Sequence, residues 1–231
     1  MKKLILGAAL AAAAAFGANA QRVVNNPSNH PFWGIRASLD VSCPTNVTYK
    51  DEGFKETESL FKNGVGFSVG AIYHLPIVAN FYFEPGLSFF YNTWANKDLG
   101  ELDEEDIDVV KNNSYRQTGL RIPLNFGYHF DFTDDFKVSI FTGPQLQVGL
   151  SCDQYVTAKA GNLEYHAAPS MYSGDDGFNR FNASWNVGVG FTYQHVYLGV
   201  TSSLEMTNMI RSDEDFTGRM NTVGIALGYN F

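Results

Sequence analysis

A histidine, a serine and two aspartates lie close together in the second half of the chain, at His166, Ser170, Asp175 and Asp176. A serine that is activated by a histidine and oriented by a carboxylate can carry out acyl transfer. The chain contains neither an H-E-x-x-H motif nor a glycine-rich phosphate loop that would point to another chemistry. We predict that this stretch is a polar surface loop, that the chain has no catalytic residue, and that the protein is not an enzyme.

The stretch KDLGELDEEDIDVVK, residues 97–111, contains seven acidic residues and two lysines. Its carboxylate oxygens suit Ca²⁺ or Mg²⁺, which could bridge the stretch to phosphate groups. It lacks the spacing of an EF-hand loop, so we predict a solvated acidic loop. The histidines are His30, His74, His129, His166 and His195. They are scattered without ligand spacing, so we predict no metal ligands, and nothing in the sequence indicates a cofactor.

Several charged residues stand inside runs that alternate between apolar and polar residues, where a charge is costly unless it is paired. They are Arg36, Asp40, Glu84, Arg121 and Glu205, with Lys137 nearer the end of a run. We expect two levels of opposite charge inside the fold, with Arg36 and Glu84 at the lower level. Arg121 should be the cation shared by acidic neighbours at the upper level. This charge network predicts a closed, structural interior, and a conducting path is the alternative.

Eight runs with a period of two follow one another along the chain, and each predicts a β-strand. They cover residues 33–42, 65–75, 81–92, 118–129, 137–150, 181–194, 197–207 and 222–231. Prolines interrupt three of the runs, at Pro85, Pro123 and Pro144, where each should mark a bulge or a strand end. The pattern predicts an all-β protein with eight strands.

The connections between the eight runs alternate in length. Three short ones lie around residues 76–80, 131–135 and 195, and longer ones cover residues 43–63, 94–114, 152–180 and 209–218. Short turns at one end and long loops at the other are typical of an antiparallel up-and-down meander that closes into a barrel. We predict that the long loops are extracellular.

The residue composition of the two strand faces indicates whether each face of the barrel contacts water, lipid or other side chains. The polar face is mostly Gly, Ser, Thr, Asn and Gln, which suit the crowded interior of an eight-stranded barrel. The apolar face is rich in aromatic rings near the strand ends, as in the aromatic girdles of membrane barrels. The rings are those of Trp33, Phe83, Tyr128, Phe181, Trp185, Tyr193 and Tyr229. A soluble, lipocalin-like barrel would instead expose a face rich in Lys and Glu, so we predict a transmembrane β-barrel in an outer membrane.

The N-terminus has the features of a secretory signal peptide. Lys2 and Lys3 precede an apolar run, and Ala18 and Ala20 form a small-residue cleavage site. We predict a signal peptide at residues 1–20, a short periplasmic segment at 21–31 and a barrel domain at 32–231. Removing the two lysines changes the formal net charge from −8 to −10. With no basic patch in the sequence, this charge argues against a nucleic-acid partner.

The chain contains two cysteines, Cys43 and Cys152, each just past the loop end of its strand. An oxidising compartment permits one disulfide between them. Their strands, the first and the fifth, should lie on opposite sides of an eight-stranded barrel, where Cα atoms are too far apart for a bridge. A bond would require the loops to fold over the mouth, so a disulfide and two free thiols both stay open.

Four stretches, LRIPLNFGYHF, FTGPQLQVGL, FYFEPGLSFFY and VGVGFTYQH, resemble strand motifs of the PorT-like outer-membrane β-barrel family. They resemble the small OmpA/OmpX-type barrels more loosely, and the resemblance covers nearly all of residues 32–231. It implies an eight-stranded barrel in the outer membrane of a Gram-negative bacterium, without enzymatic activity. Tyr229 and the terminal Phe231 also resemble the C-terminal signal by which such barrels are recognised for assembly.

The sequence defines the scaffold more closely than the task. We expect a monomer that contacts outer-membrane lipid and lipopolysaccharide, and the barrel-assembly machinery during biogenesis. The leading hypothesis is a structural or interaction platform that presents loops to an unknown surface or periplasmic protein, with a role as a secretion accessory as one form of it. A narrow pore is the alternative, and an outer-membrane lipid-modifying enzyme, which would use His166 and Ser170, ranks below both.

Overall fold

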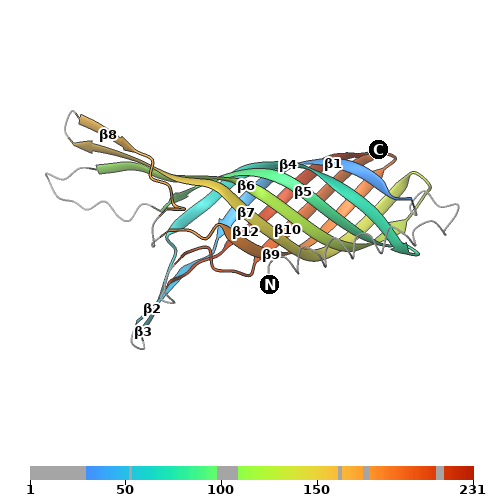
Figure 1. Cartoon of the computed structure of the whole chain (residues 1–231), viewed down its shortest axis with the longest axis horizontal. Helices are drawn as coiled ribbons and strands as arrows, with labels where there is room; N and C mark the ends of the chain where they lie inside the picture. Colours follow the sequence, from blue (N-terminus) through green and yellow to red (C-terminus); the bar gives the residue numbers. More distant parts are fainter. Residues whose placement is uncertain (1–29, 52–53, 98–108, 161–162, 174–176, 212–215) are drawn as a thin grey trace.

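The structure, a computed structural model, describes residues 30–51, 54–97, 109–160, 163–173, 177–211 and 216–231 (Figure 1). The long strands are β1 (Phe32–Pro44), β4 (Phe61–Val78), β5 (Phe81–Asn96), β6 (Val109–Asp131), β7 (Phe136–Ala160), β9 (Phe181–Tyr193), β10 (Val196–Glu205) and β12 (Met220–Asn230). The short strands are β2 (Val47–Asp51), β3 (Phe54–Glu58), β8 (Leu163–Ala167) and β11 (Phe216–Thr217). Among the residues described, no helix is long and apolar enough to cross a membrane.

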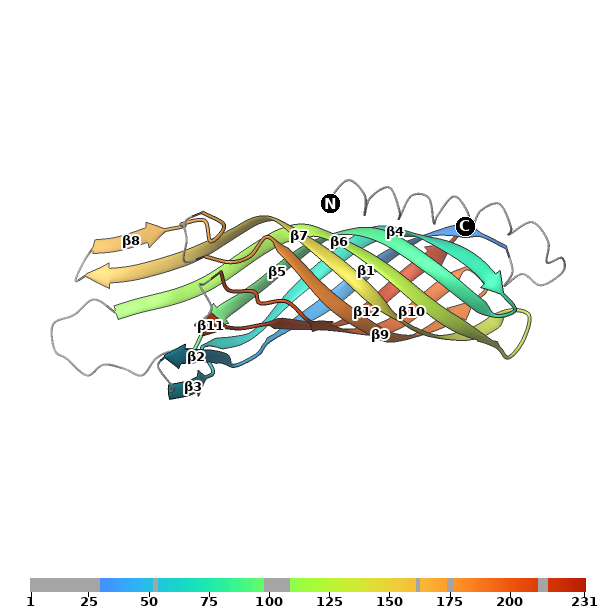
Figure 2. The same ribbon diagram turned by 60° about the horizontal axis from the view of Figure 1, so that its bottom comes forward.

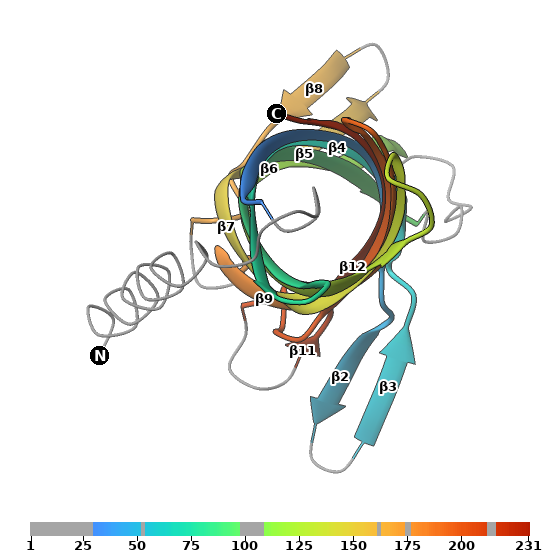
Figure 3. The ribbon, with the colours of Figure 1, turned by 90° about the vertical axis from the view of Figure 1, so that its right-hand side faces the viewer.

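The eight long strands close into an antiparallel barrel, as the sequence predicts. Their order is β6-β5-β4-β1-β12-β10-β9-β7, and β6 also pairs with β7 to complete the ring (Figure 3). The last strand closes on the first, from the pair of Gly34 with Asn230 to the pair of Pro44 with Met220. Every strand of the ring is hydrogen-bonded on both edges, so the ring has no unpaired edge to which a strand of another chain could add.

The turns at one end of the barrel are short. Residues 79–80 connect β4 to β5, residues 132–135 connect β6 to β7, and residues 194–195 connect β9 to β10. Ala79 and Gln194 have φ angles of 47° and 52°, the left-handed conformation that two-residue hairpins of the primed types require. All the additional strands project from the opposite end (Figures 1 and 2).

The apolar face of the strands points outward, which confirms the predicted orientation. Leu39 on β1 is 74 % exposed and Phe181 on β9 is 72 % exposed. The inner face carries buried polar residues, such as Asn186 and Ser42. Glycines on this face make room for aromatic side chains: a Cβ atom on Gly127 would lie 2.3 Å from the Tyr82 ring. The exterior therefore suits lipid and the interior is packed with polar and aromatic groups.

The prediction that Pro85, Pro123 and Pro144 mark bulges or strand ends is wrong. Each proline lies within a ladder that keeps its register, although residue pairs are missing between Pro85 and Ser88 and between Pro123 and Phe126. The loss of one N–H donor interrupts pairing locally without inserting a residue. Register shifts occur elsewhere. One of them lies between the pair of Thr118 with Ser151 and the pair of Gly119 with Gly149, where β7 has one extra residue, Leu150.

The segments predicted as long loops are partly strands. β2, β3 and β11 form a separate three-stranded sheet, while β8 pairs with the end of β7. β6 and β7 stay paired up to Val109 and Lys159, far beyond the last pair of β6 with β5 at Ser114. We call these two projections, β2–β3–β11 and the ends of β6–β7 with β8, the surface arms (Figure 2). Sequence periodicity missed β2, β3, β8 and β11 because strands of two to five residues are too short for an alternation to stand out.

Candidate functional site: the barrel interior

Arg121 is the centre of the upper charge level inside the barrel. Its side chain points inward from β6, and Nη1 donates to Asp40 Oδ2 on β1 at 2.6 Å. Nε donates to Gln147 Oε1 at 3.2 Å, and the guanidinium carbon lies 4.5 Å from the centre of the Phe90 ring. In the amide orientation that satisfies both groups, Asn92 accepts from Arg121 Nη2 at 2.9 Å. The ion pair is almost completely buried and spans the lumen between distant strands.

Glu205 is buried at the same end of the lumen but has a different partner. Its Oε2 atom accepts the backbone N–H of Met220 on the neighbouring strand. Asp40 receives a further hydrogen bond from the Ser38 hydroxyl. Of the two expected acidic neighbours of Arg121, the structure therefore brings Asp40 into contact, and Glu205 pairs with the backbone.

The lower charge level lies toward the short turns and is built differently from our expectation. The Arg36 guanidinium lies 4.0 Å from the centre of the Tyr197 ring, and Nη1 donates to the Ile35 carbonyl. Glu84 Oε2 lies 3.3 Å from His74 Nδ1. Glu84 thus meets a histidine, while Arg36 meets an aromatic ring. Lys137 lies at the start of β7, opposite Asp131 in the ladder.

Sequence reasoning missed that His74 and His129 meet. Their Nε2 atoms are 3.3 Å apart, and His129 Nδ1 lies 3.0 Å from Ser139 Oγ. Both histidines stand on the polar face of their strands and near a short turn, so face and distance from the turn could have placed them at the same level. Within the described residues, no group of three or more His, Cys, Asp or Glu side chains is positioned to hold a metal ion.

A cavity of about 130 Å³ lies between the two charge levels. Arg36 and Glu84 line one end, and Asp40 and Arg121 line the other. Hydroxyl groups, such as that of Ser88, and apolar groups, such as Phe141, share the wall. A cavity of this size, with charged and hydroxyl groups on part of its wall, is large enough for several water molecules.

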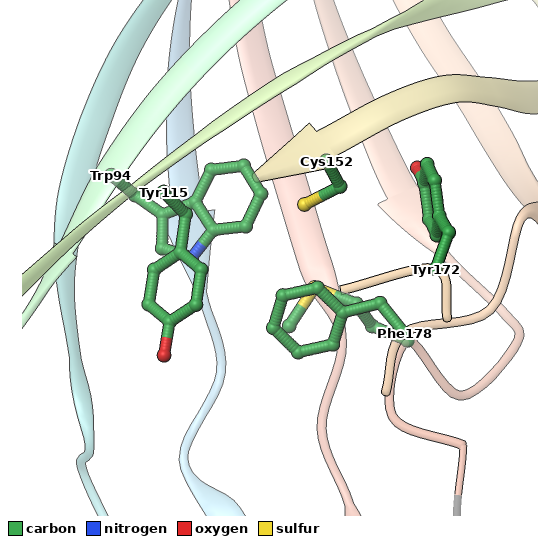
Figure 4. Packing of buried hydrophobic residues seen from close by; sticks show 6 residues of the cluster. Trp94, Tyr115, Cys152, Tyr172 and Phe178 are labelled. Carbon is green, nitrogen blue, oxygen red and sulfur yellow. The ribbon is translucent and has the colours of Figure 1, made fainter. Parts of the chain in front are cut away.

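An aromatic cluster of buried residues lies in the barrel mouth, at the end from which the surface arms project (Figure 4). Its buried members are Trp94, Tyr115, Cys152, Tyr172, Phe178 and Met209. The Trp94 and Tyr115 rings stack with centroids 5.5 Å apart, and the Phe178 ring lies 5.5 Å from that of Tyr115. Phe178 and Met209 come from connecting segments that fold inward, so the cluster joins strand and loop residues across the mouth.

Two hydrogen bonds hold the connection between β8 and β9 at Met171 and Tyr172. Gln117 Nε2 donates to Tyr172 Oη at 2.8 Å, and the Met171 N–H donates to the Cys152 carbonyl at 2.7 Å. Burial raises the pKa of the Tyr172 hydroxyl to about 12, so this hydroxyl stays protonated at neutral pH. The segment is tied to the barrel wall by side-chain and main-chain bonds.

Cys43 and Cys152 are free thiols, and no disulfide joins them. They lie on β1 and β7, which are separated by three strands in either direction around the ring. Cys152 is fully buried in the aromatic cluster because the extra residue in β7, Leu150, turns the following side chains inward. The bridge that the sequence left open is therefore not formed.

The structure places the histidine considered for acyl transfer on β8 and the serine in the segment that follows this strand. His166 lies on β8, whose backbone pairs it with Thr157, and Ser170 Oγ accepts the N–H of Tyr172. Asp175, Asp176, most of the acidic stretch at 97–111 and the predicted signal peptide lie outside the described residues. The chain also contains a G-x-S-x-G string at 66–70, but it runs through the middle of β4 rather than forming a strand-to-helix turn.

The C-terminal residues are part of the lipid-facing surface. Tyr229 pairs with Ile35 on one side and Val196 on the other, and the Phe231 N–H donates to the Trp33 carbonyl at 2.8 Å. The Tyr229 and Phe231 rings pack edge to face, with centroids 5.2 Å apart. The chain therefore ends in regular pairing with outward-pointing aromatic rings.

Comparisons with known proteins agree with a membrane barrel. The family model of the outer membrane protein beta-barrel domain matches residues 10–210. Among solved structures, OprG from Pseudomonas aeruginosa is similar with 13 % identity, a TM-score of 0.45, and coverage of 87 % of this chain and 95 % of that chain. Ail of Yersinia pestis shares 12 % identity, with a TM-score of 0.35 and coverage of 86 % and 99 %. No curated protein matches the chain.

The fold and the outward apolar face define a transmembrane β-barrel protein. The chain belongs to the outer membrane protein β-barrel domain family. This family places it in the outer membrane of a Gram-negative bacterium.

Proposed function

We propose that the protein is a closed outer-membrane platform whose function is to present the surface arms to a protein partner. The observation that carries the proposal is the aromatic cluster, which lies in the barrel mouth at the end from which the arms project. Below it, the buried pair of Arg121 and Asp40 crosses the lumen. A lumen filled at two heights supports a structural role for the interior rather than continuous conduction.

The arms supply backbone groups suited to binding an extended peptide. Among the strands that the structure describes, β3 and β8 each pair with a single strand, so each has one edge without a described neighbour in its sheet. Such an edge can bind a peptide as an added strand, with main-chain hydrogen bonds providing affinity. The partner class that suits this surface is a protein with an extended segment, including a secretion component if the PorT-like resemblance extends to function.

Conductance in planar bilayers tests the closed state. The purified barrel should produce no steady open-channel current, and a variant with Trp94→Ala and Phe178→Ala should conduct more because its mouth is less filled. A steady current from the wild-type barrel would replace the platform with the narrow pore. The cell-surface position of the arms is tested separately: protease added to intact cells should cut within 152–180 and spare residues 132–135, and the opposite pattern would reverse the orientation.

A matched deletion tests the platform itself. Replacing residues 47–58 with a two-residue turn removes β2 and β3 without touching any ring strand. Site-specific photocrosslinking from position 56 on intact cells should give a discrete protein adduct, while the same probe at Asp134, in a short turn, should not. A partner that still binds the variant without residues 47–58, or absence of any adduct from position 56, would contradict the platform.

A further inference from the structure

The charged groups at the upper end of the lumen cavity are fully satisfied by other side chains. Arg121 donates to Asp40 and to Gln147. Asn92 accepts from the remaining nitrogen in the amide orientation that satisfies both groups, and Asp40 also accepts from the Ser38 hydroxyl. The upper pair therefore has no hydrogen-bonding group left for a ligand.

Arg36, at the lower end of the same cavity, is not satisfied in this way. Its Nη1 atom donates to the Ile35 carbonyl, and the guanidinium lies over the Tyr197 ring. Within the described residues, Nε and Nη2 have no acceptor. Neither nitrogen is enclosed by the protein, and Arg36 lines the cavity, so these two donors face open space.

Glu84 is the complementary group at this end. Its Oε2 atom lies 3.3 Å from His74 Nδ1, while Oε1 has no donor among the residues that the structure describes. The Glu84 side chain is 16 % exposed and lines the cavity. In the described part of the chain, no ion pair joins Arg36 to Glu84. A cationic donor and an anionic acceptor are thus both available at the lower end.

The wall beside these two charges is apolar. It is formed by Ile72, Pro123 and Phe141. A Cβ atom on Gly34 would lie 2.7 Å from Arg36 Nη1 and 3.0 Å from Ile72 Cδ1, which places the guanidinium beside this wall. Two opposite charges and an apolar surface therefore border one space.

We propose that the lower end of the cavity binds a small zwitterion, an α-amino acid with a small apolar side chain. The ligand carboxylate accepts from Arg36 Nε and Nη2 in the paired geometry typical of a guanidinium, and the ammonium group donates to Glu84 Oε1. The ligand side chain packs against Ile72 and Pro123. The cavity, at about 130 Å³, is about ten times larger than the space that one water molecule requires, so a molecule of this size fits.

Charge balance favours a zwitterion over a simple anion or cation. The lumen already contains Arg36 with Glu84 and Arg121 with Asp40, two positive and two negative groups. A zwitterion leaves this balance unchanged, whereas an anion alone would add an uncompensated charge near Glu84, which is costly in a partly buried site.

The ligand enters from the short-turn end. Arg36 and Tyr197 are half-buried, whereas His74 and Tyr82 at the same level are fully buried, so the opening lies beside the first two. The Arg121 ion pair and the aromatic cluster close the other end. The site is therefore a pocket with one entrance, and it depends neither on conduction nor on the surface arms.

Calorimetric titration of the purified, folded barrel in detergent with L-alanine tests the site. Acetate, which lacks the ammonium group, and ethylamine, which lacks the carboxylate, are the matched ligands. We expect one alanine per barrel with a Kd below about 1 mM, and binding of acetate and ethylamine at least tenfold weaker.

Variants locate the site. Arg36→Gln and Glu84→Gln should each weaken alanine binding at least tenfold. Arg116→Gln is the matched control, because the Arg116 guanidinium also lies over a tyrosine ring, that of Tyr155, but the residue is exposed and does not line the cavity. Ser88→Leu fills the cavity without removing either charge and should abolish binding.

NMR of the arginine side chains in the wild-type barrel decides the matter even if a charge variant fails to fold. Alanine should shift the Arg36 Nε–H resonance and leave that of Arg116 unchanged. The proposal is overturned if alanine does not bind at about 1 mM, if acetate or ethylamine binds as tightly as alanine, or if Ser88→Leu binds alanine like the wild type.

Discussion

Replacing Arg121 with methionine tests the central ion pair, because methionine keeps an apolar stem but removes the charge. The Asp40 carboxylate is 3 % exposed and would lose its partner at 2.6 Å. Breaking a buried pair in this way costs about 3–5 kcal/mol. We therefore expect Arg121→Met to lower the free energy of unfolding by about 3–5 kcal/mol.

The same reasoning predicts that removing the second charge as well restores stability. The assay is urea unfolding of the barrel in lipid vesicles, followed by the heat-dependent shift of the folded band on gels. The double variant with Asp40→Asn should recover most of the loss at pH 7, because no buried charge remains. A loss below about 1 kcal/mol, or an equal loss in the double variant, would refute the reasoning.

Three further predictions concern the outer face, the mouth and the lumen. Leu146→Arg, on the lipid face, should destabilise the barrel by about 2–4 kcal/mol near the bilayer midplane, and insertion as efficient as that of the wild type would show that the face is wrongly assigned. A maleimide should label the half-buried Cys43 in the folded barrel and label the buried Cys152 only after unfolding; equal rates would mean that the mouth is open. Gly127→Val should cost about 1–3 kcal/mol by overpacking against Tyr82, and far less in a Tyr82→Ala background, as measured by the same unfolding assay.

The interior shows which contacts alternation can predict. The contact of Arg121 with Asp40 follows from two quantities readable in the sequence: the face of the strand and the distance from the turn. The contact of His74 with His129 obeys the same rule, but recognising it requires the directions of both rings, which depend on Phe32 and Tyr82. Glu205 was expected near Arg121, yet a backbone N–H on the neighbouring strand satisfies it first.

The mouth and the arms were beyond this kind of reasoning. One extra residue, Leu150, reverses the alternation in β7 and turns Cys152 inward. The alternation of apolar and polar residues in the sequence does not show where such an extra residue lies. Phe178 and Met209 lie in connecting segments, where no repeating pattern assigns a direction to side chains. The separate strands of the arms are two to five residues long, too short for an alternating pattern to stand out in the sequence, although their backbones are paired.

The pairing of β6 with β7 has a consequence for how the protein can change over time. The ladder runs from Asp131 and Lys137 up to Val109 and Lys159, although a strand needs only about 9–11 residues to cross a bilayer. The outer part of the ladder is held by main-chain hydrogen bonds, which every residue except proline can make. The side chains of this outer part can therefore change one after another while the backbone pairing, and with it the spacing and reach of the arm, persists.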